Sequence, residues 1–191
     1  MTAKEHLDRG DRLAWIEQKQ DDGLREYQRA LEIDPSLAEA HVRIAGIRHV
    51  NNDLEGAIAE HRKALKIRPD WTSARHSMAH LLVQVGRLDE AINEYQRVIS
   101  EAPKGYDGYL GVGECYLAKG QFDLAIDSFE TAVKLGRSIP LRMWLADAYR
   151  ANGDIEKAVE QWKRVAKWRP SNSDEIRIPG DALRLLAEYN L

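Results

Sequence analysis

The feature that most constrains the fold is a sequence motif that recurs about every 34 residues. The clearest copy, GRLDEAINEYQRVISEAP, occupies residues 86–103. Similar segments begin at Asn52, Gly120 and Gly153, so the four copies start at intervals of 34, 34 and 33 residues. A shortened copy, QDDGLREYQRALEIDP, ends at Pro35. A fixed period of this length is typical of repeat arrays, in which each unit packs only against its neighbours.

Each period has the apolar pattern of two amphipathic helices joined by a short turn. Gly or Asn occupies the turn, where the backbone needs a left-handed conformation that these residues tolerate. A proline ends most units, because the residue before a proline is pushed out of the helical region. We therefore expect an all-α solenoid of five helical hairpins with a C-terminal capping helix, a single array over residues 1–191. The expected hairpins cover about 4–35, 36–69, 70–103, 104–137 and 138–170, and the cap about 179–190.

Small residues recur at one position in each helix of a hairpin, where they allow the two helices to approach closely. They are Ala45, Ala79, Gly113 and Ala146 in the first helices, and Ala57, Ala91, Ala125 and Ala158 in the second. In the first unit Gly10 and Gly23 are 13 residues apart, whereas Ala45 and Ala57 are 12 apart. One extra residue near the first turn explains this difference. If Asp11 then takes the small-residue position, Arg12 and Trp15 face the same side as the matching residues of later units.

The order of large, small and aromatic residues resembles the tetratricopeptide repeat family. The fourth unit matches best, with Tyr109, Val112, Gly113, Tyr116, Ala125, Phe129 and Ala132. The resemblance covers about residues 4–170 and implies a right-handed superhelix whose first helices line a concave groove. In this family the groove binds extended peptides or partner helices. Some relatives hold a terminal carboxylate with a Lys/Asn/Arg clamp, which is missing here, since its positions hold Val42, Gly46, Ser77 and Gly111.

Counting from the small residues places a stripe of polar and aromatic side chains on the groove. The candidate partner-binding residues are Arg12, Arg43, His49, His76, His80, Gln84, Glu114, Trp144, Asp147 and Arg150. Along the groove Arg12, Arg43 and the histidines come early, whereas Asp107, Glu114 and Asp147 come later. This change of sign could orient a charged peptide or could be chance. His76 and His80 are four residues apart, a spacing that can hold a metal, but no third ligand is defined by the sequence. We expect polar groove lining there and no bound metal.

Composition and motifs exclude several other classes of protein. The net charge is −3 with both signs mixed, whereas a general nucleic-acid binder is usually strongly basic. We see neither a signal peptide nor an apolar run long enough to cross a membrane, and Cys115 is the only cysteine, so we expect a cytoplasmic protein. Cys115 itself is expected to be an inert packed thiol. No phosphate-binding loop, CxxC, HExxH or GxSxG motif occurs, so we expect no catalysis and no cofactor.

The sequence therefore favours a non-catalytic interaction scaffold that binds a partner peptide or helix in its groove. The alternative is a structural scaffold that self-associates through the array ends or through exposed aromatic residues. Trp71 and Trp168, near unit boundaries, are the feature that favours this alternative. We expect a monomer or a weak homo-oligomer with a protein or peptide partner, bound to neither nucleic acid nor membrane.

Overall fold

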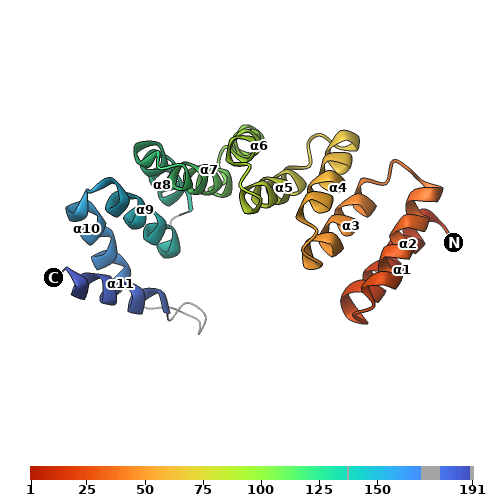
Figure 1. The fold of residues 1–191 in the computed structure, drawn as a ribbon, viewed down its shortest axis with the longest axis horizontal. Coiled ribbons are helices and arrows are strands. Elements are labelled where there is room, and N and C mark those ends of the chain that lie inside the picture. Colours follow the sequence, from red (N-terminus) through yellow and green to blue (C-terminus); the bar gives the residue numbers. More distant parts are fainter. Residues whose placement is uncertain (137, 169–176, 190–191) are drawn as a thin grey trace. The chain divides into compact units, whose positions relative to one another are not determined.

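The computed structural model describes residues 1–136, 138–168 and 177–189, and these residues form helices joined by short turns, without a β-strand (Figure 1). The helices are α1 (Ala3–Asp11), η1 (Arg12–Ile16), α2 (Gln20–Ile33), α3 (Ala38–Val50), α4 (Leu54–Ile67), α5 (Thr72–Gln84), α6 (Leu88–Glu101), α7 (Asp107–Ala118), α8 (Phe122–Gly136), α9 (Ile139–Asn152), α10 (Ile155–Ala166) and α11 (Arg177–Glu188). The predicted all-α hairpin architecture is confirmed. The predicted ends of the fourth unit at Arg137, the fifth at Pro170 and the cap at 190 lie outside the described residues.

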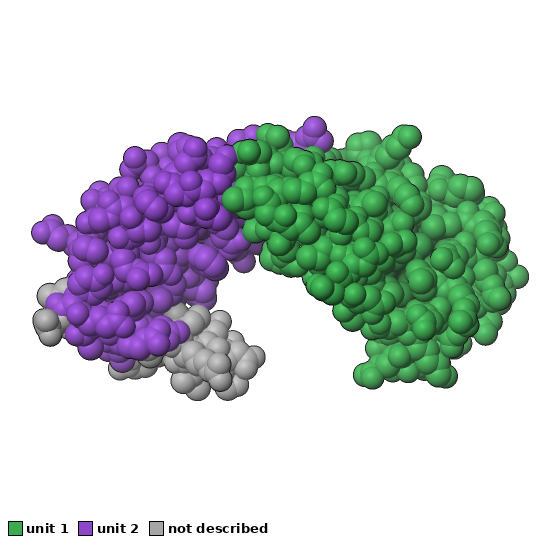
Figure 2. Space-filling model, viewed as in Figure 1, with its two compact units in different colours: residues 1–94 green, residues 95–191 purple. Residues whose placement is uncertain are grey.

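The chain divides into two compact units, unit 1 over residues 1–94 and unit 2 over residues 95–191 (Figure 2). The division falls within α6, which contributes residues to both units. The assignment of all residues to one array stays a prediction, and the two units are described separately below.

Unit 1 is built from consecutive helices that pack against their neighbours in sequence. α1 packs on α2, α2 on α3, α3 on α4 and α4 on α5. Its first core cluster consists of Leu7, Ala14, Tyr27, Ala40, Ile44 and Ile47. The small residues Ala45, Ala57 and Ala79 have no solvent exposure, as expected for positions where two helices approach closely.

The first hairpin differs from its expected register. A Cβ atom on Gly10 would lie 2.5 Å from the Tyr27 ring, so Gly10, and not Asp11, takes the small-residue position. The extra residue is absorbed by η1, a π-helical turn directly after α1. A π-turn widens the helix by one residue, and such turns are frequent at functional sites. As a result Ala14 faces Gly23 of α2, while Trp15 is 44% exposed.

The turns between the helices of a hairpin have the predicted left-handed residue. The φ angle is +60° at Asn52, +77° at Gly86, +72° at Gly120 and +89° at Gly153. The first hairpin uses Gln18, with φ +56°, at its own turn. Glycine adopts this conformation without a steric penalty, which is why it recurs at the turn.

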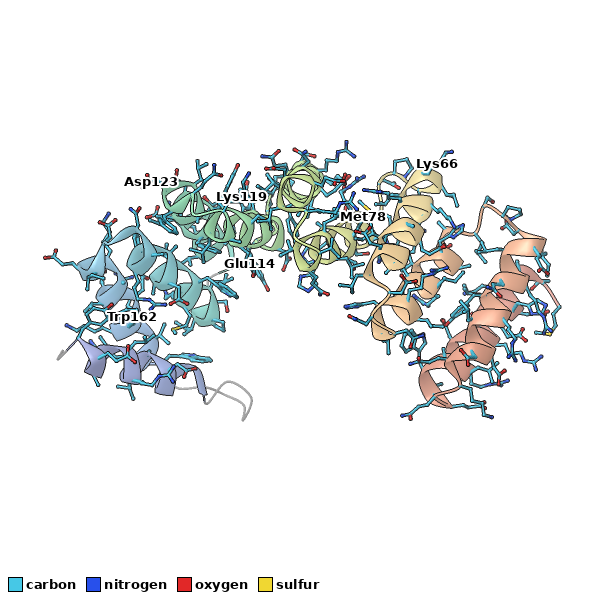
Figure 3. All side chains as sticks on the ribbon, viewed as in Figure 1. Lys66, Met78, Glu114, Lys119, Asp123 and Trp162 are labelled. Carbon is cyan, nitrogen blue, oxygen red and sulfur yellow. The ribbon has the colours of Figure 1, made fainter. Side chains whose placement is uncertain are left out.

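Unit 2 continues the same hairpin packing and ends in the cap. α7 packs on α8, α8 on α9, α9 on α10 and α10 on α11. Close approach again requires glycine, because a Cβ on Gly113 would lie 2.6 Å from the Phe129 ring. In α11, Ala182 and Leu186 are buried. Directly after α11, the centre of the Tyr189 ring lies 5.6 Å from that of Trp162 on α10. Figure 3 labels Trp162. The predicted capping helix is confirmed.

A buried polar pair, which the predictions from the sequence did not include, links the two helices of several hairpins. His6 Nδ1 lies 2.6 Å from Glu26 Oε2, and His41 Nδ1 lies 2.7 Å from Glu60 Oε2. Further along the chain, Arg75 donates to Glu94 at 2.9 Å and Arg142 donates to Gln161 at 2.9 Å. The second-helix partners Glu26, Glu60, Glu94 and Gln161 recur near the repeat period, and three of them are buried. This pairing satisfies polar groups that the hairpin encloses.

Candidate functional site

The first helices of unit 1, α1–η1, α3 and α5, carry two adjoining hollows. The Trp15 hollow, about 520 Å³, is lined by Asp8, Asp11, Arg12, Trp15, Ile16, Val42, Arg43 and Gly46. The His61 hollow, about 390 Å³, is lined by Val42, Ala45, Gly46, His49, His61, His76, Ser77, His80 and Leu81. Val42 and Gly46, one turn apart on α3, line both hollows. We call this combined surface the first-helix face of unit 1.

Asp11 organises the polar side of the Trp15 hollow. Its Oδ1 atom accepts hydrogen bonds from the Tyr27 hydroxyl at 2.7 Å and from Arg43 Nε at 2.8 Å. The hydrogen bond to Asp11 raises the pKa of the Arg43 guanidinium, so Arg43 is a fixed positive charge. Gly46 has no side chain and so leaves room for the Trp15 ring, because a Cβ at this position would lie 3.3 Å from the ring. The hollow thus combines an exposed indole with a guanidinium held in position.

His61 forms part of the wall of the second hollow from α4. It is only 6% exposed, and its Nδ1 atom is enclosed without a hydrogen-bond partner. Burial, together with the nearby His49, lowers the pKa of His61 to about 4. The ring is therefore neutral near pH 7, where it carries one donor and one acceptor nitrogen.

On unit 2, four predicted residues lie on the first helices α7 and α9. Burial raises the pKa of the Glu114 carboxyl on α7 (Figure 3), and it also raises that of Asp147 on α9. Asp147 accepts a long hydrogen bond of 3.4 Å from Arg150. Trp144 is 40% exposed and stacks on Phe129 with the ring centres 6.2 Å apart. The first helices of unit 2 thus carry two carboxyl groups, an indole and a guanidinium.

The structure brings together some of the predicted site residues. Arg12 and Arg43 line the Trp15 hollow, whereas His49, His76 and His80 line the His61 hollow. Gln84, the last residue of α5, lines neither hollow. His61 is absent from the predicted set. Its signal was nevertheless in the sequence, because an imidazole stands where the other repeats have a larger ring.

The described part of the chain also bears on metal binding, on the reactivity of Cys115 and on membrane insertion. Among residues 1–136, 138–168 and 177–189, no group of three or more His, Cys, Asp or Glu side chains could hold a metal ion. Cys115 has no solvent exposure, and burial raises the pKa of its thiol to about 11, as expected for an inert packed thiol. No helix in these ranges is both long and apolar enough to cross a membrane.

Comparison with known sequences defines the family. The profile of the tetratricopeptide repeat matches residues 12–71, 76–140 and 116–175. The protein therefore belongs to the tetratricopeptide repeat family. A comparison with curated protein sequences finds no match.

Solved structures agree with this assignment. The crystal structure of MamA protein superposes with a TM-score of 0.78 at 20% identity, over 99% of this chain and 96% of that chain. The structure of YrrB, described as a tetratricopeptide repeat protein with an unusual peptide-binding site, gives 0.76 at 19% identity, over 99% and 92%. TTC0263, a thermophilic protein from Thermus thermophilus, gives 0.68 at 20% identity, over 96% and 100%. At these identities the likeness shows the fold alone.

Proposed function

We propose that this chain is a non-catalytic interaction module that binds an extended peptide segment of a protein partner on the first-helix face of unit 1. The observation that carries the proposal is the pair of adjoining hollows that share Val42 and Gly46. A segment running across α3 would fill both hollows at once. The membership of the family agrees with such a role, and the related structure of YrrB is described as having a peptide-binding site.

The side chains in the Trp15 hollow suit a binding surface. Trp and Arg are enriched among residues that dominate binding energy, because they combine large contact area with directed polar groups. Arg43 is already held by Asp11, so little side-chain freedom is lost when a partner binds. An exposed indole beside a fixed guanidinium would anchor an apolar residue and an acceptor group of the partner.

We include the first-helix residues of unit 2 in the proposal as a second contact surface. Glu114, Trp144, Asp147 and Arg150 would contact a part of the partner whose charge complements two carboxylates. Complementary charge acts more on specificity and association rate than on affinity. The proposal also takes the protein to be a cytoplasmic monomer or weak homo-oligomer that needs no cofactor.

The experiment is selection of peptides from a random display library on the full chain, followed by affinity measurement with single variants. Gly46→Leu places a bulky side chain between the two hollows and should weaken the selected peptides by about tenfold or more. Ala59→Leu, at an exposed position of α4, is the matched control and should bind like the original chain. Full-strength binding by Gly46→Leu would contradict the assignment of this face.

A further inference from the structure

The His61 hollow exists at a position where other hairpins hold a large ring. The residues at the corresponding place in the period are Tyr27, Tyr95, Phe129 and Trp162, each at most 1% exposed. An imidazole is smaller than a phenol or an indole. The smaller ring leaves additional room in the wall of the hollow, about 390 Å³, that residues of α3, α4 and α5 line.

His61 is an unusual residue to find in the wall of this hollow. Buried polar groups are nearly always hydrogen-bonded, yet its Nδ1 atom has no partner. A half-turn of the ring exchanges nitrogen and carbon positions with little change in shape. A polar group entering the hollow could therefore pair with either ring nitrogen.

The titratable groups that line the hollow are all histidines. They are His49 from α3, His61 from α4, and His76 and His80 from α5. None of the described lining residues is acidic. The charged neighbours of these histidines along α3 and α4 face other partners, since Arg48 donates to Asp53 and Glu60 bonds to His41 and Lys63. Imidazole changes only between neutral and positive, so any charge that the hollow acquires favours an anion.

We propose that the His61 hollow binds the side-chain carboxylate of a glutamate or aspartate in the bound peptide segment. This inference rests on the proposed function and names the partner chemistry of the same face. The carboxylate would accept hydrogen bonds from the imidazoles and the Ser77 hydroxyl, while Val42 and Leu81 cover the methylene groups. We propose a side chain and not a chain terminus, because the positions of a terminal-carboxylate clamp on this face hold Val42, Gly46 and Ser77.

Binding should be coupled to proton uptake. In the free protein, burial lowers the pKa of His61 to about 4, so the ring is neutral near pH 7. A carboxylate beside the ring favours its charged form and raises this pKa. Affinity for the acidic peptide should therefore increase as the pH falls from 7 towards 5, as long as the carboxylate remains ionised.

The first test uses a small probe and needs no partner. N-acetyl-glutamate methylamide is titrated into the full chain while the histidine ring nitrogens are observed by NMR. The nitrogens of His61 should shift, and those of His6 and His41, which are already paired with Glu26 and Glu60, should not. The matching glutamine compound is the uncharged control. Equal shifts with that control or with inorganic phosphate would overturn the assignment to a carboxylate side chain.

The second test uses peptides selected by display on the full chain. They should share an acidic residue at one position, and its replacement by the matching amide should weaken binding about tenfold or more. His61→Phe restores a large ring. This variant should bind the acidic peptide and the amide-substituted peptide equally weakly. If His61→Phe does not fold, His61→Gln keeps the size similar, removes the imidazole and should lose the same preference.

The two tests separate this inference from the proposed function. Selected peptides that lose affinity in Gly46→Leu but tolerate the amide replacement would overturn the inference and leave the proposed function standing. A glutamate probe that shifts His61, in a chain that selects no peptide, would support the carboxylate chemistry and contradict the proposed function. Undiminished preference for the acidic peptide in His61→Phe would overturn the inference.

Discussion

His61 should make stability depend on pH in a way that a single substitution can remove. Its pKa is about 4 in the folded chain, below the value of 6.5 that an exposed histidine has when the chain is unfolded. Between these values the unfolded chain binds a proton that the folded chain does not, so stability falls as the pH falls. From pH 7 to pH 5 this contribution is about 2 kcal/mol.

His61→Phe should lower the pH-dependent loss of stability by about that amount. It should also raise stability at pH 7 by roughly 1–3 kcal/mol, because it removes an unpaired buried nitrogen. Urea unfolding of both proteins at pH 7 and pH 5 measures the two effects. An equal loss in both proteins would mean that His61 titrates in the folded state as it does when unfolded.

Gly113 should tolerate no side chain, because the Phe129 ring occupies the space. A Cβ atom there would lie 2.6 Å from the ring, so Gly113→Leu should destabilise the chain by about 1–3 kcal/mol through overpacking. Gly46→Leu is the matched control, since Gly46 borders open hollows and meets only the movable Trp15 ring. Denaturant midpoints of the two variants should move apart. An unchanged midpoint for Gly113→Leu would contradict the close approach of α7 and α8.

The packing of one helix on another depends in part on the buried polar pairs. Arg75 is 6% exposed and bonds to Glu94 and to the carbonyl oxygen of Pro69. Arg75→Leu leaves the Glu94 carboxylate without this partner and should cost about 2–4 kcal/mol. The double variant Arg75→Leu/Glu94→Leu should recover much of that loss, since apolar residues often replace a buried ion pair well.

An exposed ion pair provides the control for that experiment. Arg62 donates to Glu90 at 2.9 Å, but both side chains are about half exposed. Arg62→Ala should therefore change stability by less than about 1 kcal/mol. Chemical unfolding of Arg75→Leu, Arg75→Leu/Glu94→Leu and Arg62→Ala measures the change in the free energy of unfolding for each variant. Equal effects of Arg75→Leu and Arg62→Ala would mean that burial adds nothing to the pair.

The capping helix should stabilise unit 2 through one face only. Leu186 is 7% exposed and belongs to the core of unit 2, whereas Leu183 on the same helix is 58% exposed. Leu186→Asp should therefore lower the melting temperature and favour aggregation by uncovering α10, because a terminal repeat needs a polar cover. Leu183→Asp should melt like the original chain. Deletion of residues 177–191 should act like Leu186→Asp, and a deletion that changes nothing would show that α11 is not a cap.

For the chain as a whole, the question is whether it associates with itself. Tryptophans near unit boundaries were the feature that favoured self-association. One of them, Trp71, is less available for contact with a second chain, because the Arg68 guanidinium covers its ring at 3.5 Å from the ring centre. We expect light scattering to give the mass of one chain across the micromolar range. A mass that rises with concentration would favour the self-associating scaffold, and Trp15 and Trp144 would be the first residues to test.

The sequence by itself determined the hairpins, their turns and their close contacts. These features depend on local spacing: apolar residues on one helical face, a left-handed residue at Asn52 or Gly86, and a small residue such as Ala45 or Gly113 in each helix. Packing between successive hairpins repeats the same contacts every period, so one pattern describes them all. The cap followed from the same logic, since an apolar end requires a cover.

Only the tertiary structure decided where the two hollows lie and that His61 Nδ1 has no hydrogen-bond partner there. The His61 hollow depends on side chains from three helices and on how much space one imidazole leaves, which helical spacing does not describe. The register of Trp15 depended on whether the extra residue of the first hairpin entered the helix as a π-turn or lengthened the loop. Both outcomes preserve the apolar pattern, so the sequence left them open, and packing against Gly23 and Tyr27 selected one.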